Sequence, residues 1–417
     1  MLRHRDFRLY FIGNVCSNFG TWLQNTAQIL LAYRLTGSAA AVGLVVCAQF
    51  SFPLVVGPWA GMLADRLDRR RLLITTHVAS AAIAALLASL EFSGRLGLPA
   101  LAAGALGIGL AFAFTLPAVT ALVPMLVPED ATEKETEEQT KAAMAMNTVS
   151  FNIGRALAPL LGVGLIATVG FGWAFTLNAI SFIVLTAVFL VLSPRHPGRP
   201  AEKPRLMDGV RIALGERRIL VVLGMVAVIT VTTDPPLVLG PALARDVFHV
   251  TDYWSGYFLA ALGTGTVLGS LVPSKGPSLR RVGIYCAFMG GAMVCFGVAP
   301  NVWVSTIAAL AAGAAALLAT AATQTILFAL AGPPRMGRVM AVWAAAFAGS
   351  RPIASLVDGW LASAVGVRGA AVVIALPALL LGVGAALTHM SSGVEGWARG
   401  LLAEDALAAR SGLQALR

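Results

Sequence analysis

Phe151-Asn-Ile-Gly-Arg155-Ala-Leu-Ala-Pro-Leu160 and Phe347-Ala-Gly-Ser-Arg351-Pro-Ile-Ala-Ser-Leu356 are two copies of one pattern, and together they decide the fold. Each copy lies in a long apolar run and places its arginine about twelve residues into that run. With a rise of about 1.5 Å per residue, both arginines are expected near the middle of a helix that crosses a bilayer. The recurrence indicates two homologous halves.

Apolar runs of spanning length continue outward from both copies along almost the whole chain. Of the 417 residues, 58% are hydrophobic and 12% are charged, whereas a soluble domain carries about 25% charged residues. The sequence predicts an all-α polytopic membrane protein with twelve transmembrane helices in two pseudo-symmetric six-helix bundles. The predicted spans are 9–33, 38–64, 71–92, 98–126, 143–168 and 172–192, followed by 219–243, 253–273, 281–299, 302–330, 339–365 and 369–391.

The polar segments divide the chain into four parts. We expect an N-terminal bundle at 1–192, a cytoplasmic linker at 193–218, a C-terminal bundle at 219–392 and a cytoplasmic tail at 393–417. A second polar insertion, Pro128 to Lys141, is rich in glutamate. It is expected to be a solvated loop, with an ion or partner site as the alternative.

The basic residues orient the chain in the membrane. With a cytoplasmic N-terminus, 24 of the 30 Lys and Arg residues fall in cytoplasmic segments, and the outer loops hold only Arg34, Arg95, Arg245 and Arg368. Because positive charge stays on the cytoplasmic side during insertion, we expect both termini in the cytoplasm and the protein in the cell (inner or plasma) membrane. The net charge of +10 is thus topogenic, and no nucleic-acid partner is expected.

No enzyme, cofactor or metal site is predicted. The four cysteines lie inside apolar runs without metal-ligand spacing. The sequence has no phosphate-binding Walker loop and no nucleophile elbow with a plausible partner set. An ion gradient is therefore the expected energy source. Protons are the most plausible ion, since aspartate is the titrating group available in the spans.

The loop after the second predicted span carries the most specific motif. Residues 61–71 read Gly-Met-Leu-Ala-Asp-Arg-Leu-Asp-Arg-Arg-Arg, which resembles the loop signature Gly-x-Leu-Ala-Asp-Arg-x-Gly-Arg-Arg of the major facilitator superfamily. The resemblance implies the major facilitator fold and a loop that latches the two halves in one alternating-access state. A topogenic role for the arginines is the alternative, and Asp68 departs from the family's glycine. The implied gating residues are Gly61, Asp65, Arg66, Arg69 and Arg70.

A second motif lies in the fifth predicted span. Gly154-Arg-Ala-Leu-Ala-Pro159-Leu-Leu-Gly162-Val-Gly164 is similar to the antiporter motif of family exporters, with Ala158 and Val163 in place of two glycines. Gly154, Pro159 and Gly162 keep the pattern, which favours export over import and also suits close helix packing. Three further stretches, 35–38, 175–182 and 335–340, resemble the branch that contains bacterial macrolide-efflux and enterobactin-exporter proteins.

A polar stripe runs along the first predicted span, at positions i, i+4, i+7, i+11 and i+14. Facing lipid would be costly, so the stripe is expected to face a cavity, with interhelical hydrogen bonding as the alternative. Because family helices 1, 4, 7 and 10 line the central cavity, the resemblance adds two residues of the tenth span. The predicted cavity lining is Asn14, Asn18, Thr21, Asn25, Gln28, Thr320 and Gln324.

Four charges remain inside the spans, and such groups usually line pathways or pair with one another. Asp234 precedes Pro235 and Pro236, where the helix must break, and it is the first choice for proton or substrate coupling. Arg351 and Asp358 share one helix face, so Arg351 holds a structural ion pair across the interface or takes part in coupling. Arg155 completes the set, and the sequence leaves open which aspartate carries a proton.

Taken together, the pattern predicts a secondary active transporter that exports small amphipathic or lipophilic compounds in exchange for protons, by alternating access. An antibiotic, a secondary metabolite or a siderophore fits the apolar lining. The expected partners are this small-molecule substrate, protons and the lipid bilayer. Two alternatives stay open: a lysophospholipid or metabolite carrier of the same fold, and a membrane sensor or scaffold that no longer transports.

Overall fold

The computed structural model describes residues 2, 4–126, 133–192, 206–273 and 277–387, in which the regular elements are helices. The first half contains α1 (Arg5–Thr36), α2 (Ala39–Arg66), α3 (Arg69–Phe92), α4 (Leu98–Leu122) with the 3-10 turn η1 (Val123–Leu126), α5 (Glu133–Val169) and α6 (Phe171–Val191). The second half contains α7 (Leu206–Gly215), α8 (Arg217–Thr232), α9 (Pro235–Val238), α10 (Gly240–Ala242), the π turn η2 (Leu243–Val247), α11 (Trp254–Ser270), α12 (Leu279–Val298) and α13 (Val302–Leu387).

The long element α13 is three helices in succession. Its backbone leaves helical geometry at Gly332 (φ 65°) and at Gly366 (φ 77°). A positive φ is inexpensive only for glycine, so these two residues mark the turns between consecutive spans. The three spans predicted over 302–391 are thereby confirmed.

Twelve segments cross the molecule. Eight helices of the described residues are long and apolar enough to span a membrane, and one of them, Arg338–Gly384, contains the turn at Gly366 and comprises two segments. The three others are α1, α2 and α11. In α1 the polar stripe lowers the hydropathy, and α11 has only 17 residues. The predicted twelve-helix fold is confirmed.

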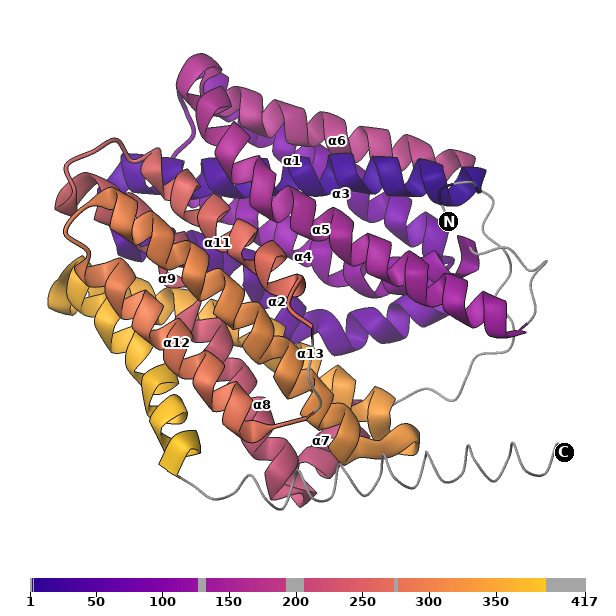
Figure 1. The fold of residues 1–417 in the computed structure, drawn as a ribbon. Coiled ribbons are helices and arrows are strands. Elements are labelled where there is room, and N and C mark those ends of the chain that lie inside the picture. Colours follow the sequence, from indigo (N-terminus) through magenta and orange to yellow (C-terminus); the bar gives the residue numbers. More distant parts are fainter. Residues whose placement is uncertain (1, 3, 127–132, 193–205, 274–276, 388–417) are drawn as a thin grey trace, which may run out of the picture.

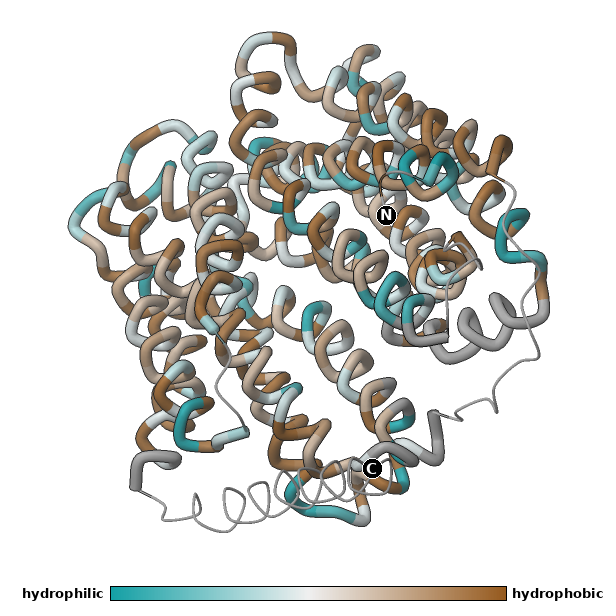
Figure 2. Tube along the Cα trace, turned by 45° about the vertical axis from the view of Figure 1, so that its right-hand side comes forward, coloured by the Kyte–Doolittle hydropathy of each residue, from teal (hydrophilic) through white to brown (hydrophobic). Residues whose placement is uncertain are grey.

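The helices form two bundles that lie side by side (Figures 1 and 2). In the first bundle, α1 packs against α5 and α6, α2 packs against α4, and α3 packs against α4 and α6. In the second bundle, α8, α11 and α12 pack against segments of α13. The bundles meet along two seams, one between α2 and α13 and one between α5 and α11.

Two polar segments contain helices that the sequence analysis did not predict. The stretch from Glu133 to Lys141 was expected to be a loop, but α5 begins at Glu133. Glutamate is favourable in the first turn of a helix, because its negative charge interacts with the positive end of the helix dipole. Glutamate and lysine are also good helix formers. Within the predicted linker, 206–215 form α7, which packs against α13. Residues 193–205 and the predicted tail, 393–417, lie outside the described residues.

Candidate functional site

Among the described residues, the backbones of the two bundles come closest at one end. We call the end where α1 begins the proximal end, and the end where α1 stops, at Thr36, the distal end. In the distal half of the α2–α13 seam, a Cβ at Gly359 would lie 2.7 Å from the Cα of Ala40, and a Cβ at Gly43 would collide with the carbonyl oxygen of Ser355. Side chains are thus excluded by backbone contact, and the seam is closed there.

The second seam is equally tight. A Cβ at Gly263 of α11 would lie 2.9 Å from the Cα of Ala156, and a Cβ at Gly256 would collide with Val163 of α5. Both contacts lie from the middle of α5 toward its distal end. The two seams therefore seal the same end of the molecule.

Charged groups link the two bundles at the distal end. Arg34 at the end of α1 donates from Nε to Asp252 Oδ2 (2.6 Å) and from Nη2 to Asp252 Oδ1 (2.9 Å). Its guanidinium also lies over Phe171 of its own bundle and Tyr253 of the other bundle, at 5.0 and 4.6 Å from the ring centroids. A bidentate, charge-assisted pair of this kind is among the stronger polar contacts in proteins.

A second hydrogen bond supports this distal pair. Tyr33 donates its hydroxyl to Asp246 of the π turn η2 in the other bundle. Consecutive residues of α1 are thus bound to two carboxylates of the C-terminal bundle. We call Tyr33, Arg34, Asp246 and Asp252 the distal latch.

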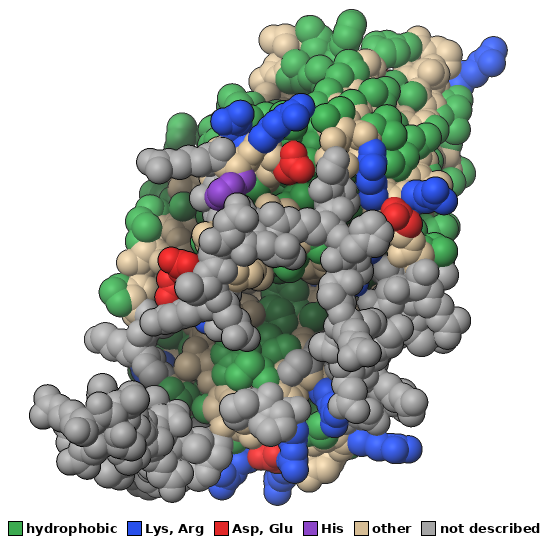
Figure 3. Space-filling model, turned by 90° about the vertical axis from the view of Figure 1, so that its right-hand side faces the viewer, with side chains coloured by type: hydrophobic (Ala, Val, Ile, Leu, Met, Phe, Trp, Pro, Cys, Tyr) green, Lys and Arg blue, Asp and Glu red, His purple; other side chains and the backbone are tan. Residues whose placement is uncertain are grey.

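The proximal end is open. Figure 3 looks onto this end and shows a hollow between the bundles with hydrophobic side chains on its walls. The two bundles diverge toward this end (Figure 2).

An ion pair lies in the middle of the molecule. Asp234 is at the break between α8 and α9, as the two prolines predict, and it is 2% exposed. Its Oδ1 is 4.0 Å from Nε of Arg351, and its Oδ2 has no hydrogen-bond partner. The prediction for Arg351 placed its pair across the interface, but Asp234 belongs to the same bundle, and Arg351 instead reaches across through its cation–π contact with Phe50 of α2 (5.2 Å).

The two other intramembrane charges differ sharply from this pair. Asp358 is 0% exposed, and neither of its carboxylate oxygens has a hydrogen-bond partner. Arg155 of α5 is partly exposed and lies over the ring of Trp22, 5.9 Å from its centroid. Arg155, Arg351, Asp234 and Asp358 are close enough for their charges to interact, so the structure gathers all four predicted coupling residues into one cluster.

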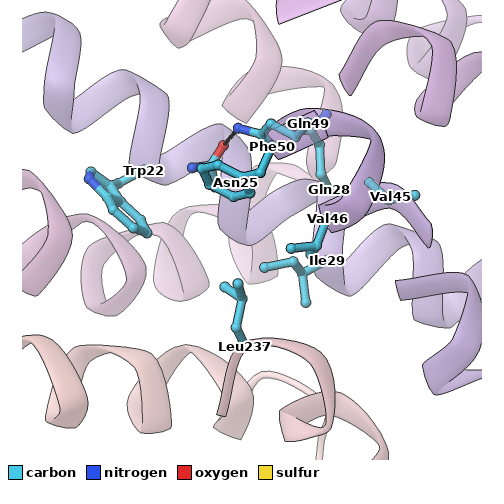
Figure 4. A pocket seen from close by; sticks show the side chains of 9 residues that line it. All are labelled: Trp22, Asn25, Gln28, Ile29, Val45, Val46, Gln49, Phe50 and Leu237. Atoms are coloured by element: carbon cyan, nitrogen blue, oxygen red, sulfur yellow. Dashed lines mark hydrogen bonds between the residues drawn. The ribbon is translucent and has the colours of Figure 1, made fainter. Parts of the chain in front are cut away.

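A narrow pocket adjoins this cluster (Figure 4). Asn25 accepts a hydrogen bond of 2.7 Å from Gln49 Nε2 on its wall. Gln28 is 1% exposed, and neither its amide nitrogen nor its amide oxygen has a partner. Residues of α1, α2 and α9 line the pocket: Trp22, Asn25, Gln28, Ile29, Val45, Val46, Gln49, Phe50 and Leu237.

The remainder of the polar stripe has other partners. Asn14 donates to Asn147 Oδ1 (3.0 Å) and Ser150 Oγ (3.1 Å), and Asn18 donates to Ser150 Oγ (2.9 Å). These bonds join α1 to α5, as the alternative interpretation of the stripe proposed. Thr21 donates to a carbonyl of its own helix.

The two residues added from the tenth span, Thr320 and Gln324, are partly buried on α13 and do not line the pocket of Figure 4. Thr320 donates to the carbonyl of Ala316. Their role as cavity lining stays a prediction.

The loop motif is described in part. The side chains of Gly61, Asp65 and Arg66 lie outside the described residues. Arg70 donates to the carbonyls of Phe189 (2.6 Å) and Leu190 at the end of α6, and Arg69 contacts Met125. Asp68 caps α3 by accepting from the backbone N–H of Arg71 (2.8 Å), which gives this departure from the family pattern a structural use. The gating role stays a prediction.

The antiporter-like motif forms a close helix contact within one bundle. A Cβ at Gly154 would lie 3.0 Å from the backbone of Asn18, and one at Gly162 would lie 2.7 Å from Leu23 Cδ1. Both neighbours are on α1. Pro159 lies on the opposite seam, where its carbonyl is 3.0 Å from the Cβ position of Gly256. α5 thus packs against α1 and against the other bundle at once.

The sequence analysis missed the distal latch and the aromatic partners of the two arginines. Arg34 was read as a loop residue, and Asp246 and Asp252 were not singled out. A single acidic residue in an outer loop has no periodic signal. The sequence pattern therefore could not predict that Tyr33 and Arg34 bind carboxylates more than 200 positions away. Two carboxylates between the seventh and eighth predicted spans, opposite Arg34, were the available hint.

The fold and the site define a membrane transporter of the major facilitator type. The chain belongs to the transmembrane secretion effector family, whose sequence profile matches residues 1–401. It is 27% identical over 330 residues to the enterobactin exporter EntS of Shigella flexneri, a match that covers 77% of this chain and 73% of that exporter.

Solved transporters share the fold. A bacterial homologue of the human lysosomal transporter Spinster, in an inward-facing and occupied conformation, matches with a TM-score of 0.71 and 14% identity over 92% of this chain and 97% of its own. A POT family transporter in complex with 5-aminolevulinic acid matches with a TM-score of 0.71 and 13% identity over 94% and 96%. These relatives are membrane transporters, and this chain is a transporter rather than an enzyme.

Proposed function

We propose that this transporter exports small amphipathic or lipophilic compounds in exchange for protons, by alternating access. The observations that carry the proposal are the hollow at one end, the two closed seams at the other end and the four charged residues in the middle of the molecule. A compound bound beside the charges leaves on the other side once the distal seams open and the proximal ends come together.

The topology gives this movement a direction. Positive charge is in excess at the N-terminus, in the linker and in the loops that follow even-numbered spans, which favours cytoplasmic termini. The proximal hollow then faces the cytoplasm, and the membrane is the inner or plasma membrane. The conformation described here is then the loading state of an exporter. Similarity to an enterobactin exporter supports export and includes siderophores among the candidate cargoes, beside antibiotics and secondary metabolites.

Proton coupling is assigned to the two aspartates. An ionised carboxylate with no hydrogen bond is too costly in a buried site, so Asp358 carries a proton in this conformation. Asp234 stays ionised beside Arg351. For exchange with cargo, Asp358 takes up its proton from the distal side when the distal seams part, and releases it on the proximal side before the next compound is moved outward. The proton thus moves in the direction opposite to the compound.

Efflux tests this proposal in cells that lack their own exporters. A panel of antibiotics, siderophores and amphipathic dyes is loaded, and retention is compared between expressing and empty cells, with and without a protonophore. We expect lower retention in expressing cells, and the difference disappears when the proton gradient collapses. Equal retention across the panel contradicts export.

A matched pair of variants tests the role of Asp358. Asp358→Asn imitates the protonated carboxyl, so we expect compound exchange between the two sides of proteoliposomes to persist while uphill transport is lost. Asp6→Asn removes the same charge from the proximal end of α1 and should leave both activities unchanged. Uphill transport by Asp358→Asn at the wild-type level removes Asp358 from the coupling scheme.

A further inference from the structure

The repeat that produces the two central arginines leaves one of them without a counter-ion. Arg351 has Asp234 at 4.0 Å. Among the described residues, Arg155 has no carboxylate within ion-pair distance and donates no hydrogen bond. Its one close partner is the face of Trp22. A guanidinium in the membrane interior normally pairs with an anion, because an uncompensated charge there is expensive.

The surroundings of Arg155 add to the positive charge. Asp358 is buried with both carboxylate oxygens unpartnered, and an isolated carboxyl of this kind is neutral. Two guanidinium groups then face one ionised carboxylate, that of Asp234. The middle of the hollow therefore has a net positive charge of about one in this conformation, which an anion would offset.

Two aromatic rings adjoin Arg155. Phe151 lies one turn before Arg155 on the same face of α5 and is 38% exposed. Its ring meets Trp22 edge-on, with centroids 5.6 Å apart. Because α5 runs from the proximal to the distal end, Phe151 lies on the proximal side of Arg155. Trp22 is 7% exposed, so most of the accessible apolar surface beside the guanidinium belongs to Phe151. We call this surface the Trp22–Phe151 shelf.

The other bundle also has an aromatic pair near its arginine, but both rings are on one helix. Phe347 lies one turn before Arg351 and stacks on Trp343, with centroids 5.5 Å apart and an interplanar angle of 11°. The indole Nε1 of Trp343 is buried without an acceptor. Each arginine thus has an aromatic pair near it, although Arg351 lies over Phe50 and not over its own pair. The two halves also differ in that, among the described residues, the arginine of the first half has no carboxylate within ion-pair distance.

From this asymmetry we propose that Arg155 binds the anionic group of the transported compound, and that the Trp22–Phe151 shelf binds its planar apolar part. The substrate class is an aromatic amphipathic anion, with a carboxylate, sulfonate or phenolate group that the guanidinium holds through paired hydrogen bonds. The inference rests on the proposed export function and names the substrate chemistry of that site.

Two fluorescent probes with one skeleton test the inference. 8-Anilinonaphthalene-1-sulfonate is an aromatic anion, and N-phenyl-1-naphthylamine is the same skeleton without the sulfonate. Dissociation constants are measured by fluorescence on the purified transporter in lipid nanodiscs, with protein-free nanodiscs as the background. The wild-type protein is expected to bind the sulfonate more tightly than the neutral probe.

Variants of Arg155 give the decisive comparison. Arg155→Gln should weaken sulfonate binding by about tenfold or more, because a charge-assisted hydrogen-bonding partner is lost, and should change binding of the neutral probe by less than about twofold. Arg155→Lys keeps the positive charge but loses the paired hydrogen bonds, so it should keep a reduced preference for the anion. Arg95→Gln removes an exposed arginine at the distal end and should change neither constant.

Two results overturn the inference: sulfonate binding that Arg155→Gln leaves unchanged, or an equal loss of binding for both probes. Because binding is measured without transport, this test separates the two proposals. Sulfonate binding through Arg155 without export of any compound supports this inference and contradicts the proposed function. Export of neutral or cationic compounds with sulfonate binding that ignores Arg155 supports the function and contradicts the inference.

Discussion

The distal and proximal ends of the interface between the bundles differ in what holds them. At the distal end, glycines bring backbones into contact along both seams, and Arg34 binds Asp252 through two charged hydrogen bonds. At the proximal end, the bundles are separated by a hollow (Figure 3). The difference teaches that the chain has two distinct features: a closed contact at the distal end and a charged cluster in the middle. Substitutions can change either feature without touching the residues of the other.

The largest effect on stability and transport is expected at the charged cluster, midway between the two ends. Asp234→Asn leaves Arg351 buried without a counter-charge, and breaking a buried pair typically costs about 3 kcal/mol or more. The melting temperature of the purified protein should fall clearly, and transport should be lost. In the double variant Asp234→Asn/Arg351→Gln, both charges are gone, and a melting temperature no higher than that of the single variant would show that the pair is not the source of the loss.

A smaller effect is expected from overfilling the distal seam. Gly43→Ala places a methyl group against the carbonyl of Ser355, at a cost of about 1–3 kcal/mol, so closure of the distal end should weaken and transport should fall by roughly tenfold. Gly164→Ala is the matched control, since a Cβ there meets nothing within 4 Å. Equal transport rates in the two variants would mean that the seam is not tight during the cycle.

The distal latch should contribute less than the backbone contacts. Arg34→Gln removes a bidentate charged interaction worth about 1.5–3 kcal/mol, but the side chain is 31% exposed, and water compensates part of the loss. Cysteine labelling of distal positions should become faster, by up to about tenfold. The charge-reversed pair Arg34→Asp/Asp252→Arg should restore slow labelling, and continued fast labelling there contradicts the latch.

The smallest effect is expected inside one bundle. Asn14→Ala removes two hydrogen bonds between α1 and α5, and such bonds in membranes average about 0.6 kcal/mol. Stability should fall slightly, and transport should stay near the wild-type rate because neither seam changes. A severe loss of transport at unchanged stability would instead give Asn14 the cavity role that the stripe first indicated.

The features predictable from sequence are those set by periodicity and local chemistry. Apolar length placed the twelve helices, the prolines after Asp234 predicted its helix break, and the repeat predicted two equivalent arginines. Pairings across the two bundles were not predictable. Arg351 contacts Phe50, and Arg34 contacts Asp252, because of how the bundles pack. Residues so distant in sequence leave no periodic trace.

High charge also led to a wrong prediction in one place. The acidic run before Lys141 was taken for a loop because it is highly charged, although its residues favour helix and α5 begins at Glu133. The polar stripe of α1 was read as one surface, but its members divide between the pocket and the α5 contact. Sequence spacing predicts a shared face, and only packing decides which neighbour each residue on that face meets.

The central claim is that the two ends open and close in opposition. Its most direct test measures two distances by electron paramagnetic resonance, after Cys16, Cys47, Cys286 and Cys295 are replaced by serine. One spin-label pair, at Leu35 and Thr251, spans the distal end, and another, at Leu67 and Leu214, spans the proximal end. As pH or an exported compound shifts the population, the account predicts that the distal distance lengthens while the proximal distance shortens. Distances that both stay fixed, or that change in the same direction, contradict it.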